Sequence, residues 1–272
     1  MLVAYFHSGF STTKTKAFTG LHWDSVKQIE KTYLLKKHKK PALTQVRYLG
    51  IDEVYLGKKL GYITVVRDLL SGAVLFIGTG KGGDALQAFR KRIGRKAKQI
   101  KAVRVDMSNA YSAWVAEVLP HSEIFYDRFH VIKLMNERMD NLRRSTMNKL
   151  AEEQKKELKG KRHLLLRNQE NLPNEAAREL KKLRFEFEDL GTASLMKEYL
   201  RNSYRMADCC QTARSAFMLW CEKAEVSGIH CLKQMARTIR KRIEGLLAFW
   251  KHHRLTNASQ EGFNKKIGWL TR

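Results

Sequence analysis

The hydrophobic pattern divides the chain into regions of different character. Between residues 46 and 132, short runs of β-branched and aromatic residues are separated by turn sequences such as GKKLG and LSG, a pattern typical of strands. It predicts strands at 48–56, 62–69, 73–80, 100–107 and 123–129, and helices at 82–97 and 109–119. A three-stranded meander followed by alternating strands and helices indicates a mixed sheet covered by helices.

Strand signals disappear from about residue 130 to residue 255. Apolar residues at helical spacing mark one amphipathic helix at its start, with Val131, Leu134, Met135, Met139 and Leu142 on one face. Highly charged helical sequence follows, and we expect breaks near Gly160, residues 171–173 and Gly191. The sequence therefore predicts an all-helical region at 133–255, followed by a polar loop and a further helix that begins near Ser259.

Ahead of the predicted sheet, residues 11–37 have the pattern of two short helices separated at Gly20. The second helix is expected to begin around Asp24 or Ser25, with Val26, Ile29 and Tyr33 on its apolar face. This is the outline of a helix-turn-helix whose second helix enters the major groove of DNA. An ordinary amphipathic hairpin with a solvated lysine face gives the same pattern. Residues 36–42, which contain Pro41, are predicted to be a linker.

The formal net charge is +25, with 52 Lys and Arg against 27 Asp and Glu. A chain this basic favours a polyanionic partner, and nucleic acid is more common than an anionic membrane surface. No apolar run approaches the length of a membrane span, and the first ten residues lack the positive start of a signal peptide, so we expect a cytoplasmic protein. The four cysteines form no C-x-x-C pair, which favours reduced and mostly buried thiols over a zinc site.

Two aspartates occupy positions where a strand normally buries apolar side chains. Asp52 lies inside YLGIDEVYL, and Asp106 ends the strand in VRVDMS. Such an aspartate is costly unless it is hydrogen-bonded, ion-paired or bound to a metal, and a turn-capping or salt-bridged role is the simpler explanation for either one alone. Glu261, in the first turn of the last predicted helix, is a candidate third acid or a plain helix-start glutamate. Three carboxylates suit two Mg²⁺ or Mn²⁺ ions, which support in-line phosphoryl transfer.

Four motifs together resemble the DDE transposases of bacterial insertion sequences, and most closely the ISL-three family: GIDE (50–53), VDMSNAY (105–111), FYDRFHVIKLMN (125–136) and TNASQEGFNKKI (256–267). The resemblance implies an α/β ribonuclease H-like domain with a mixed sheet, interrupted after its fifth strand by an all-helical insertion and preceded by a small helix-turn-helix segment. It assigns the catalytic and metal-binding triad to Asp52, Asp106 and Glu261.

The same resemblance implies supporting residues around this triad, namely Asp127, Arg128, His130, Asn257 and Asn264. Arg128 is suited to holding a phosphate and His130 to orienting other groups, although structural pairing of both with nearby carboxylates is equally compatible with the motif. Asn257 and Asn264 are expected to shape the segment that presents Glu261. Compared with that family, the chain lacks a cysteine-rich segment at the start and a further stretch at the end, so we expect it to be truncated at both ends.

These inferences divide the chain into a helix-turn-helix segment and linker (1–40), a first catalytic part (46–132), a helical insertion (133–255) and a final catalytic helix (256–272). The expected function is metal-dependent DNA cleavage and strand transfer, acting on element ends and target DNA as a homo-oligomer. The alternatives are an inactive, truncated DNA-binding protein and a ribonuclease H-like nuclease. The candidate DNA contacts outside the catalytic centre are Lys27, Lys31, Lys36, Lys37, Lys39 and Lys40.

Overall fold

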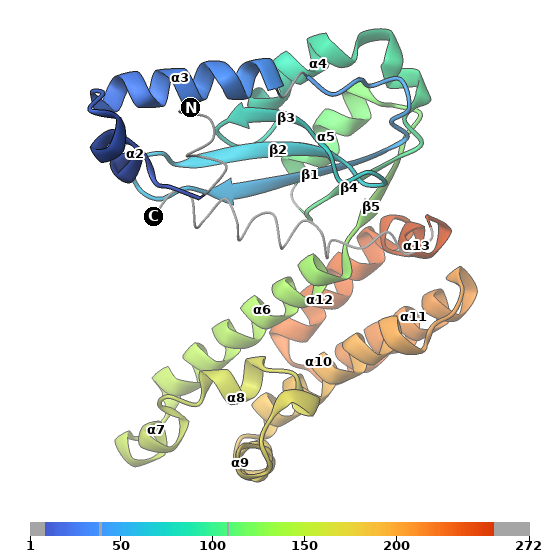
Figure 1. The fold of residues 1–272 in the computed structure, drawn as a ribbon. Helices are drawn as coiled ribbons and strands as arrows, with labels where there is room; N and C mark the ends of the chain where they lie inside the picture. The colour runs from blue at the N-terminus through green and yellow to red at the C-terminus, as the bar shows by residue number, and fades with distance from the viewer. Residues whose placement is uncertain (1–8, 38–39, 108, 253–272) are drawn as a thin grey trace. The chain divides into compact units, whose positions relative to one another are not determined.

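The structure is a computed structural model that describes residues 9–37, 40–107 and 109–252 (Figure 1). The chain divides into two compact units, Met1–Ala42 and Leu43–Arg272. None of the described helices combines the length and the apolar character that crossing a bilayer requires.

The first unit contains two helices, α2 (Thr12–Thr19) and α3 (Trp23–Lys37), which contact each other. Gly20 separates them with a φ of 70° and ends α2, as the sequence predicted. Helix α3 begins slightly earlier than expected, at Trp23. Val26 is fully buried, but Ile29 is 40% exposed, so the predicted apolar face is only partly covered. The described residues of this unit offer α3 a single short helix to pack against, which explains the exposure.

The second unit is built around a five-stranded sheet with strand order β3-β2-β1-β4-β5. The strands are β1 (Tyr48–Tyr55), β2 (Tyr62–Asp68), β3 (Val74–Thr79), β4 (Ala102–Val105) and β5 (Glu123–Tyr126). Strands β1, β2 and β3 form an antiparallel meander, while β4 and β5 run parallel to β1. The mixed sheet was therefore predicted correctly. The prediction of a strand as far as residue 129 was wrong, because Asp127 ends the extended segment by capping the next helix.

One face of the sheet is covered by the helices between the strands. These are η1 (Asp84–Leu86), α4 (Gln87–Ile93), η2 (Gly94–Gln99) and α5 (Asn109–Val118), and Figure 1 shows α4 and α5 along the sheet. The single helix predicted at 82–97 is thus three shorter pieces. Ile51 and Val105 from the strands share a core with Phe89 of α4 and Trp114 of α5. This core fixes β1 and β4 as rigid neighbours.

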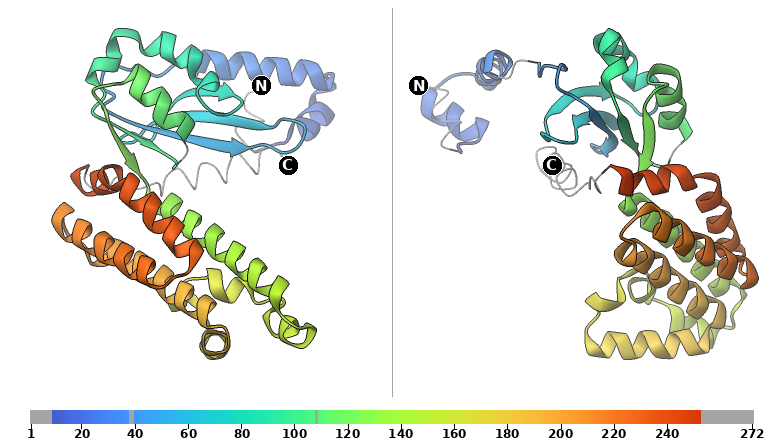
Figure 2. Two further views of the ribbon diagram at one scale, coloured as in Figure 1. Left: turned by 180° about the vertical axis from the view of Figure 1, so that it is seen from behind. Right: turned by 90° about the vertical axis from the view of Figure 1, so that its right-hand side faces the viewer.

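From Arg128 onward the described chain is helical, as predicted. The helices are α6 (Arg128–Lys149), α7 (Glu152–Leu158), α8 (Arg162–Leu166), η3 (Gln169–Asn171), α9 (Asn174–Glu186), α10 (Glu188–Met206), α11 (Cys210–Val226), α12 (His230–Lys241) and α13 (Ile243–Lys251). Helix α6 contacts α10 and α12, and α10 contacts α11, so these four long helices lie side by side in both views of Figure 2. The described cysteines are free thiols; Cys221 and Cys231 are buried, whereas Cys209 is exposed.

The predicted helix breaks were right at two positions and wrong at the third. Gly160 separates α7 from α8 with a φ of 77°, and α9 begins directly after Pro173. Gly191, in contrast, lies inside α10. The actual break is at Phe187, and a Cβ on Gly191 would lie 2.3 Å from the backbone oxygen of Arg184. This glycine allows two helices to approach closely and does not end one.

Candidate functional site

The structure places Asp52 and Asp106 at the same edge of the sheet. Strands β1 and β4 are parallel neighbours, and Gly50 pairs with Arg104. Continuing this register by two residues brings Asp52 beside Asp106, and the alternation of side chains along a strand puts both on one face. Both residues are half-buried, and Asp52 Oδ1 accepts a hydrogen bond of 2.8 Å from the backbone N–H of Glu53. The two carboxylates therefore belong to one site.

The neighbouring acid, Glu53, has a different environment on the opposite face of β1. The hydroxyl of Tyr111 in α5 donates a 2.8 Å hydrogen bond to Glu53 Oε1. The same hydroxyl lies 2.9 Å from Thr64 Oγ1 and accepts a bond from the N–H of Gly82. Burial raises the pKa of Tyr111, against the opposing effect of its bonds to Thr64 and Gly82. Glu53 therefore anchors α5 to the sheet.

Arg104 is a central residue of the site that the sequence reasoning missed. Its side chain is 1% exposed, and it lies on the same face as Asp52 and Asp106. Glycine at position 50 makes room for it, because a Cβ there would lie 2.8 Å from Arg104 Nη2. Burial lowers the pKa of the Arg104 guanidinium, and the negative charges of Asp127 and Asp52 oppose that effect. The sequence feature that points to Arg104 is a charged residue between two valines of a strand, in VRV.

Asp127 completes a row of aspartates along the carboxyl ends of the parallel strands. Val105 pairs with Tyr126, so the residues that follow them, Asp106 and Asp127, are at the same level. Asp127 is buried, and its Oδ1 accepts a 2.8 Å bond from the N–H of Phe129 as the N-cap of α6. Its Oδ2 is 4.0 Å from Arg104 Nη1. Asp127 therefore connects the sheet, the buried arginine and the first helix of the helical region.

The other two residues of the DRFH motif are placed differently. Arg128 is exposed and His130 is half-buried, with its ring 5.6 Å from the ring of Phe129. Within the described residues, no carboxylate oxygen lies within 4.0 Å of either side chain. Arg128 is thus exposed, and the choice between a phosphate-binding role and structural pairing stays a prediction for both residues.

Helix α13 packs on the face that carries the aspartates. Ala248 of α13 clusters with Ala102 and Phe125, which share the face of Arg104 by alternation and by register. Just after this helix, the His252 ring lies 5.6 Å from the rings of Tyr48 and Phe125. The chain therefore leaves α13 on the acidic face, near the amino-terminal ends of β1 and β5.

Several predicted site residues lie outside the described residues, namely Glu261, Asn257, Asn264 and Lys39. Among the residues that the structure describes, there is no group of three or more His, Cys, Asp or Glu side chains arranged to hold a metal ion. The described part of the candidate site thus consists of the aspartate pair with Arg104 and Asp127 beside it.

The comparisons with known proteins agree with the motif resemblance. A family model described as a transposase, of the ISL3 type, matches residues 49–272. The chain belongs to the ISL3 transposase family. It is 34% identical over 254 residues to the transposase for insertion sequence element IS1001 of Bordetella parapertussis, covering 92% of this chain and 62% of that protein. It is also 26% identical over 251 residues to the transposase for IS1557 of Mycobacterium tuberculosis, covering 84% of this chain and 56% of that protein.

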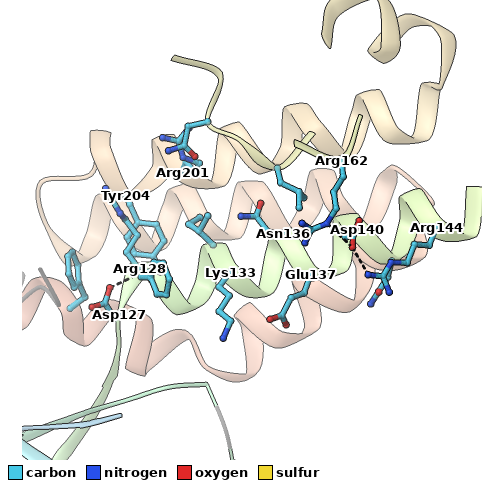
Figure 3. A pocket seen from close by; sticks show the side chains of 16 residues that line it. Asp127, Arg128, Lys133, Asn136, Glu137, Asp140, Arg144, Arg162, Arg201 and Tyr204 are labelled. Carbon is cyan, nitrogen blue, oxygen red and sulfur yellow. Dashed lines mark hydrogen bonds and ion pairs between the residues drawn. The ribbon is translucent and has the colours of Figure 1, made fainter. Parts of the chain in front are cut away.

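A large groove in this ISL3-family chain begins at Asp127 and follows α6. It has a volume of about 990 Å³ and is lined from α6, α8, α10 and α13. Figure 3 shows that Arg128 and Lys133 lie toward its Asp127 end, while Arg144 and Arg162 lie near Asp140. The groove therefore connects the aspartate row at the sheet edge with a basic cluster in the helical region.

Asp140 organises that cluster. Its carboxylate is 6% exposed and forms ion pairs with Arg143 at 2.8 Å, Arg144 at 2.9 Å and Arg162 at 3.1 Å. Burial alone raises the pKa of Asp140, but the hydrogen bonds from Arg143 and Arg162 outweigh it and hold the pKa below its usual value. One carboxylate thus fixes three guanidinium groups, which leaves an excess of positive charge at this end of the groove.

Proposed function

We propose that this chain carries out metal-dependent DNA cleavage and strand transfer in the transposition of an insertion sequence, with Asp52, Asp106 and Glu261 as the acidic triad. The proposal includes a ribonuclease H-like fold for the sheet and a helical insertion at residues 133–255. The observation that carries it is the placement of Asp52 beside Asp106 at the carboxyl ends of adjacent parallel strands. The chain spans about 62% of the length of the IS1001 transposase and 56% of that of IS1557, so the activity of those whole proteins comes to this chain only as a proposal.

The donor set fits Mg²⁺ or Mn²⁺. Both aspartates offer hard carboxylate oxygens, which these ions prefer, and each is only half-buried. Two such ions would supply activation of the attacking oxygen and stabilisation of the leaving oxygen. The chain's own contribution is to hold Asp52 and Asp106 on rigid neighbouring strands, while the buried charge of Arg104 offsets the repulsion among the aspartates.

Chain length supports the inclusion of Glu261 in the triad. Glu261 follows His252 by nine residues, and His252 contacts Tyr48, which lies four residues before Asp52 on the same face of β1. Four strand residues span about 13 Å. Nine residues span about 14 Å as a helix and about 30 Å when extended, so the carboxylate is within reach in either conformation.

The basic surfaces suggest the path of DNA. Lys27, Lys31, Lys36, Lys37 and Lys40 are exposed in the first unit, which supports its role as a DNA-binding helix-turn-helix. Lys27 also lies 3.8 Å from the ring centroid of Trp23. We propose that the groove along α6 takes the phosphate backbone of a strand that leaves the aspartates, with Arg128 and Lys133 as its first contacts. Assembly as a homo-oligomer on DNA stays a prediction.

A strand-transfer assay with the 272-residue chain, labelled element-end DNA, target DNA and Mg²⁺ or Mn²⁺ tests the proposal. Asp52→Ala, Asp106→Ala and Glu261→Ala should each abolish cleavage, while DNA affinity stays within about twofold because each removes only one acid from a basic surface. Glu53→Gln is the matched control, since it changes the adjacent acid but keeps an acceptor for Tyr111. If Asp106→Ala cuts at the wild-type rate, the triad assignment is wrong.

The same assay separates the two alternatives. A DNA-binding protein without catalysis would bind element ends equally well with and without divalent metal, and it would yield no cut product. A nuclease of the same fold would release cut ends in Mg²⁺ but never join a 3′ end to the target. The resemblance of the chain to named transposases over most of its length favours transposition over both.

A further inference from the structure

The far end of the β1–β2 ribbon carries two exposed aromatic rings. Tyr55 and Tyr62 are the last cross-strand partners of this antiparallel pair. Their ring centroids are 4.9 Å apart with an interplanar angle of 44°, and the residues are 52% and 40% exposed. Lys81 Nζ lies 5.3 Å from the ring centroid of Tyr62. The pair thus presents aromatic surface beside a positive charge.

The backbone around these rings is fixed by hydrogen bonds. In the turn, the N–H of Leu56 donates to the oxygen of Gly61, and the N–H of Gly61 donates to the oxygen of Gly57, both at 2.8 Å. Gly57 and Gly61 have φ values of 98° and 67°, which glycine adopts without strain. The N–H of Gly80 donates to the oxygen of Tyr62 at 2.8 Å, and this bond holds the following residue, Lys81, over the ring.

The charge around the rings is positive. Lys58 and Lys59 are exposed in the turn, and together with Lys81 and the two tyrosines they form what we call the tyrosine–lysine surface. The acids nearest in sequence are Asp52, which is on the opposite face of β1, Glu53, which is engaged by Tyr111, and Asp84, which is exposed at the start of η1. Three lysines against one accessible carboxylate complement a polyanion and disfavour a basic or purely apolar partner.

The position of this surface relates it to the aspartate site. Tyr55 follows Asp52 by three residues in β1, a distance of about 10 Å along the strand. The Tyr55 side chain is on the face of the sheet opposite to Asp52. The β1–β2 ribbon extends beyond the last residue of β4, so the path from one site to the other runs around the free end of this ribbon. A DNA strand that is held at Asp52 and turns around the free end of the ribbon would meet the tyrosine–lysine surface.

We propose that the tyrosine–lysine surface binds an unpaired nucleotide of the DNA, with its base stacked on Tyr55 and Tyr62 and its phosphates held by Lys58, Lys59 and Lys81. Aromatic rings interleaved with lysines are the chemistry that recognises single-stranded nucleic acid without sequence preference. The inference rests on the proposed function only for the location of the strand. It deepens that function by assigning the surface to DNA that is frayed or unpaired next to the cleavage point.

Binding in EDTA tests this inference without any catalytic step. The 272-residue chain is titrated onto a blunt duplex and onto the same duplex with a short single-stranded overhang that carries 2-aminopurine, whose fluorescence is quenched by stacking. Tyr55→Ala and Tyr62→Ala should weaken overhang binding about tenfold and remove most of the quenching, while blunt-duplex affinity changes less than twofold. Lys58→Ala should lower the salt slope of overhang binding by about 0.7.

Two controls make the result specific. Tyr62→Phe keeps the ring and should retain quenching and affinity, and Phe185→Ala removes an aromatic ring that is 92% exposed in α9 and should change neither. Overhang binding by both alanine variants at wild-type affinity overturns the inference, and so does an equal loss for blunt and overhang DNA. Because no cleavage occurs in EDTA, this result is independent of the Asp106→Ala assay, whose failure would reject the catalytic proposal alone.

Discussion

Neutralising Asp127 tests whether this residue serves the buried Arg104 or the metal site. Asp127→Asn keeps a side-chain oxygen for the N-cap of α6, since Asn and Asp cap helices equally well. The change removes the negative charge 4.0 Å from Arg104 Nη1, in a pair whose side chains are 1% and 6% exposed. The guanidinium then keeps the charge of Asp52 as a partner but loses that of Asp127.

The magnitude follows from the geometry. Two unit charges 4.0 Å apart interact by about 4 kcal/mol at an effective dielectric constant of 20, and breaking a buried ion pair from one side usually costs about 3–5 kcal/mol. Because Asp52 still compensates part of the charge, we expect Asp127→Asn to lower the free energy of unfolding by about 2–4 kcal/mol. The double variant Arg104→Met/Asp127→Asn should recover at least about 1.5 kcal/mol of the summed single losses.

Urea denaturation followed by circular dichroism measures these free energies. Asp84→Asn is the matched control, because Asp84 is exposed at the start of η1 and its neutralisation should change stability by less than about 0.5 kcal/mol. Losses that simply add in the double variant would refute the reasoning, as they would mean that the two side chains do not interact. An Asp127→Asn protein of wild-type stability would do the same and would favour a role for Asp127 at the metal site over one as the partner of Arg104.

Three further predictions concern the helical region. Gly191→Ala should lower the free energy of unfolding, measured by urea denaturation, by about 1–3 kcal/mol, because the new Cβ would lie 2.3 Å from the Arg184 oxygen. Helix propensity alone predicts the opposite, a gain of about 1 kcal/mol. A stabilised variant would show that the two helices can move apart at little cost. Lys197→Met should lower the free energy of unfolding by about 1–3 kcal/mol in the same assay, because the buried Nζ donates hydrogen bonds to the oxygens of Leu165 and Arg167 at 2.8 and 2.7 Å. An unchanged urea midpoint would contradict this prediction. The pKa of Asp140 is lowered in the folded state, so its stabilising effect is present above the unfolded pKa of about 3.9 and is lost as the pH falls through the folded value. The stability difference between wild type and Asp140→Asn should therefore shrink below about pH 4, and a constant difference would reject the ion-pair explanation.

The sheet could be predicted from sequence because its signals are local. Runs of β-branched residues between glycine-containing turns define β1, β2 and β3 almost to the residue. The same logic located the aspartate pair, because a carboxylate inside an apolar run is conspicuous when no turn explains it. Placing Asp52 and Asp106 at one edge requires the order of the strands. The local pattern of each strand does not contain that order, and the four-motif resemblance only implies it.

What could not be predicted depends on contacts between distant segments. The sequence predicts a helix break at Gly191, because glycine disfavours helix interiors. Its close approach to Arg184 is a contact between helices that no periodicity encodes. The strand prediction extends through the DRF segment because that segment directly follows the strand-like residues IFY and ends on a phenylalanine, although Asp127 directly before amphipathic spacing is also a capping signal. The sequence does not single out Arg104, because basic residues are common throughout this chain and its burial depends on contacts with Gly50 and Asp127 from other segments.

The four acidic residues near this end of β1, β4 and β5 differ in role because their neighbours differ. Glu53 is committed to the hydroxyl of Tyr111 on one face, and Asp127 is committed to the cap of α6 and to Arg104. Asp52 and Asp106 lie beside each other on the other face. The groove along α6 begins at Asp127, at the same edge of the sheet. Since a buried guanidinium already lies on that face, the site tolerates several carboxylates at once, and the two acids of the proposed triad that the structure describes, Asp52 and Asp106, are on the same face as Arg104.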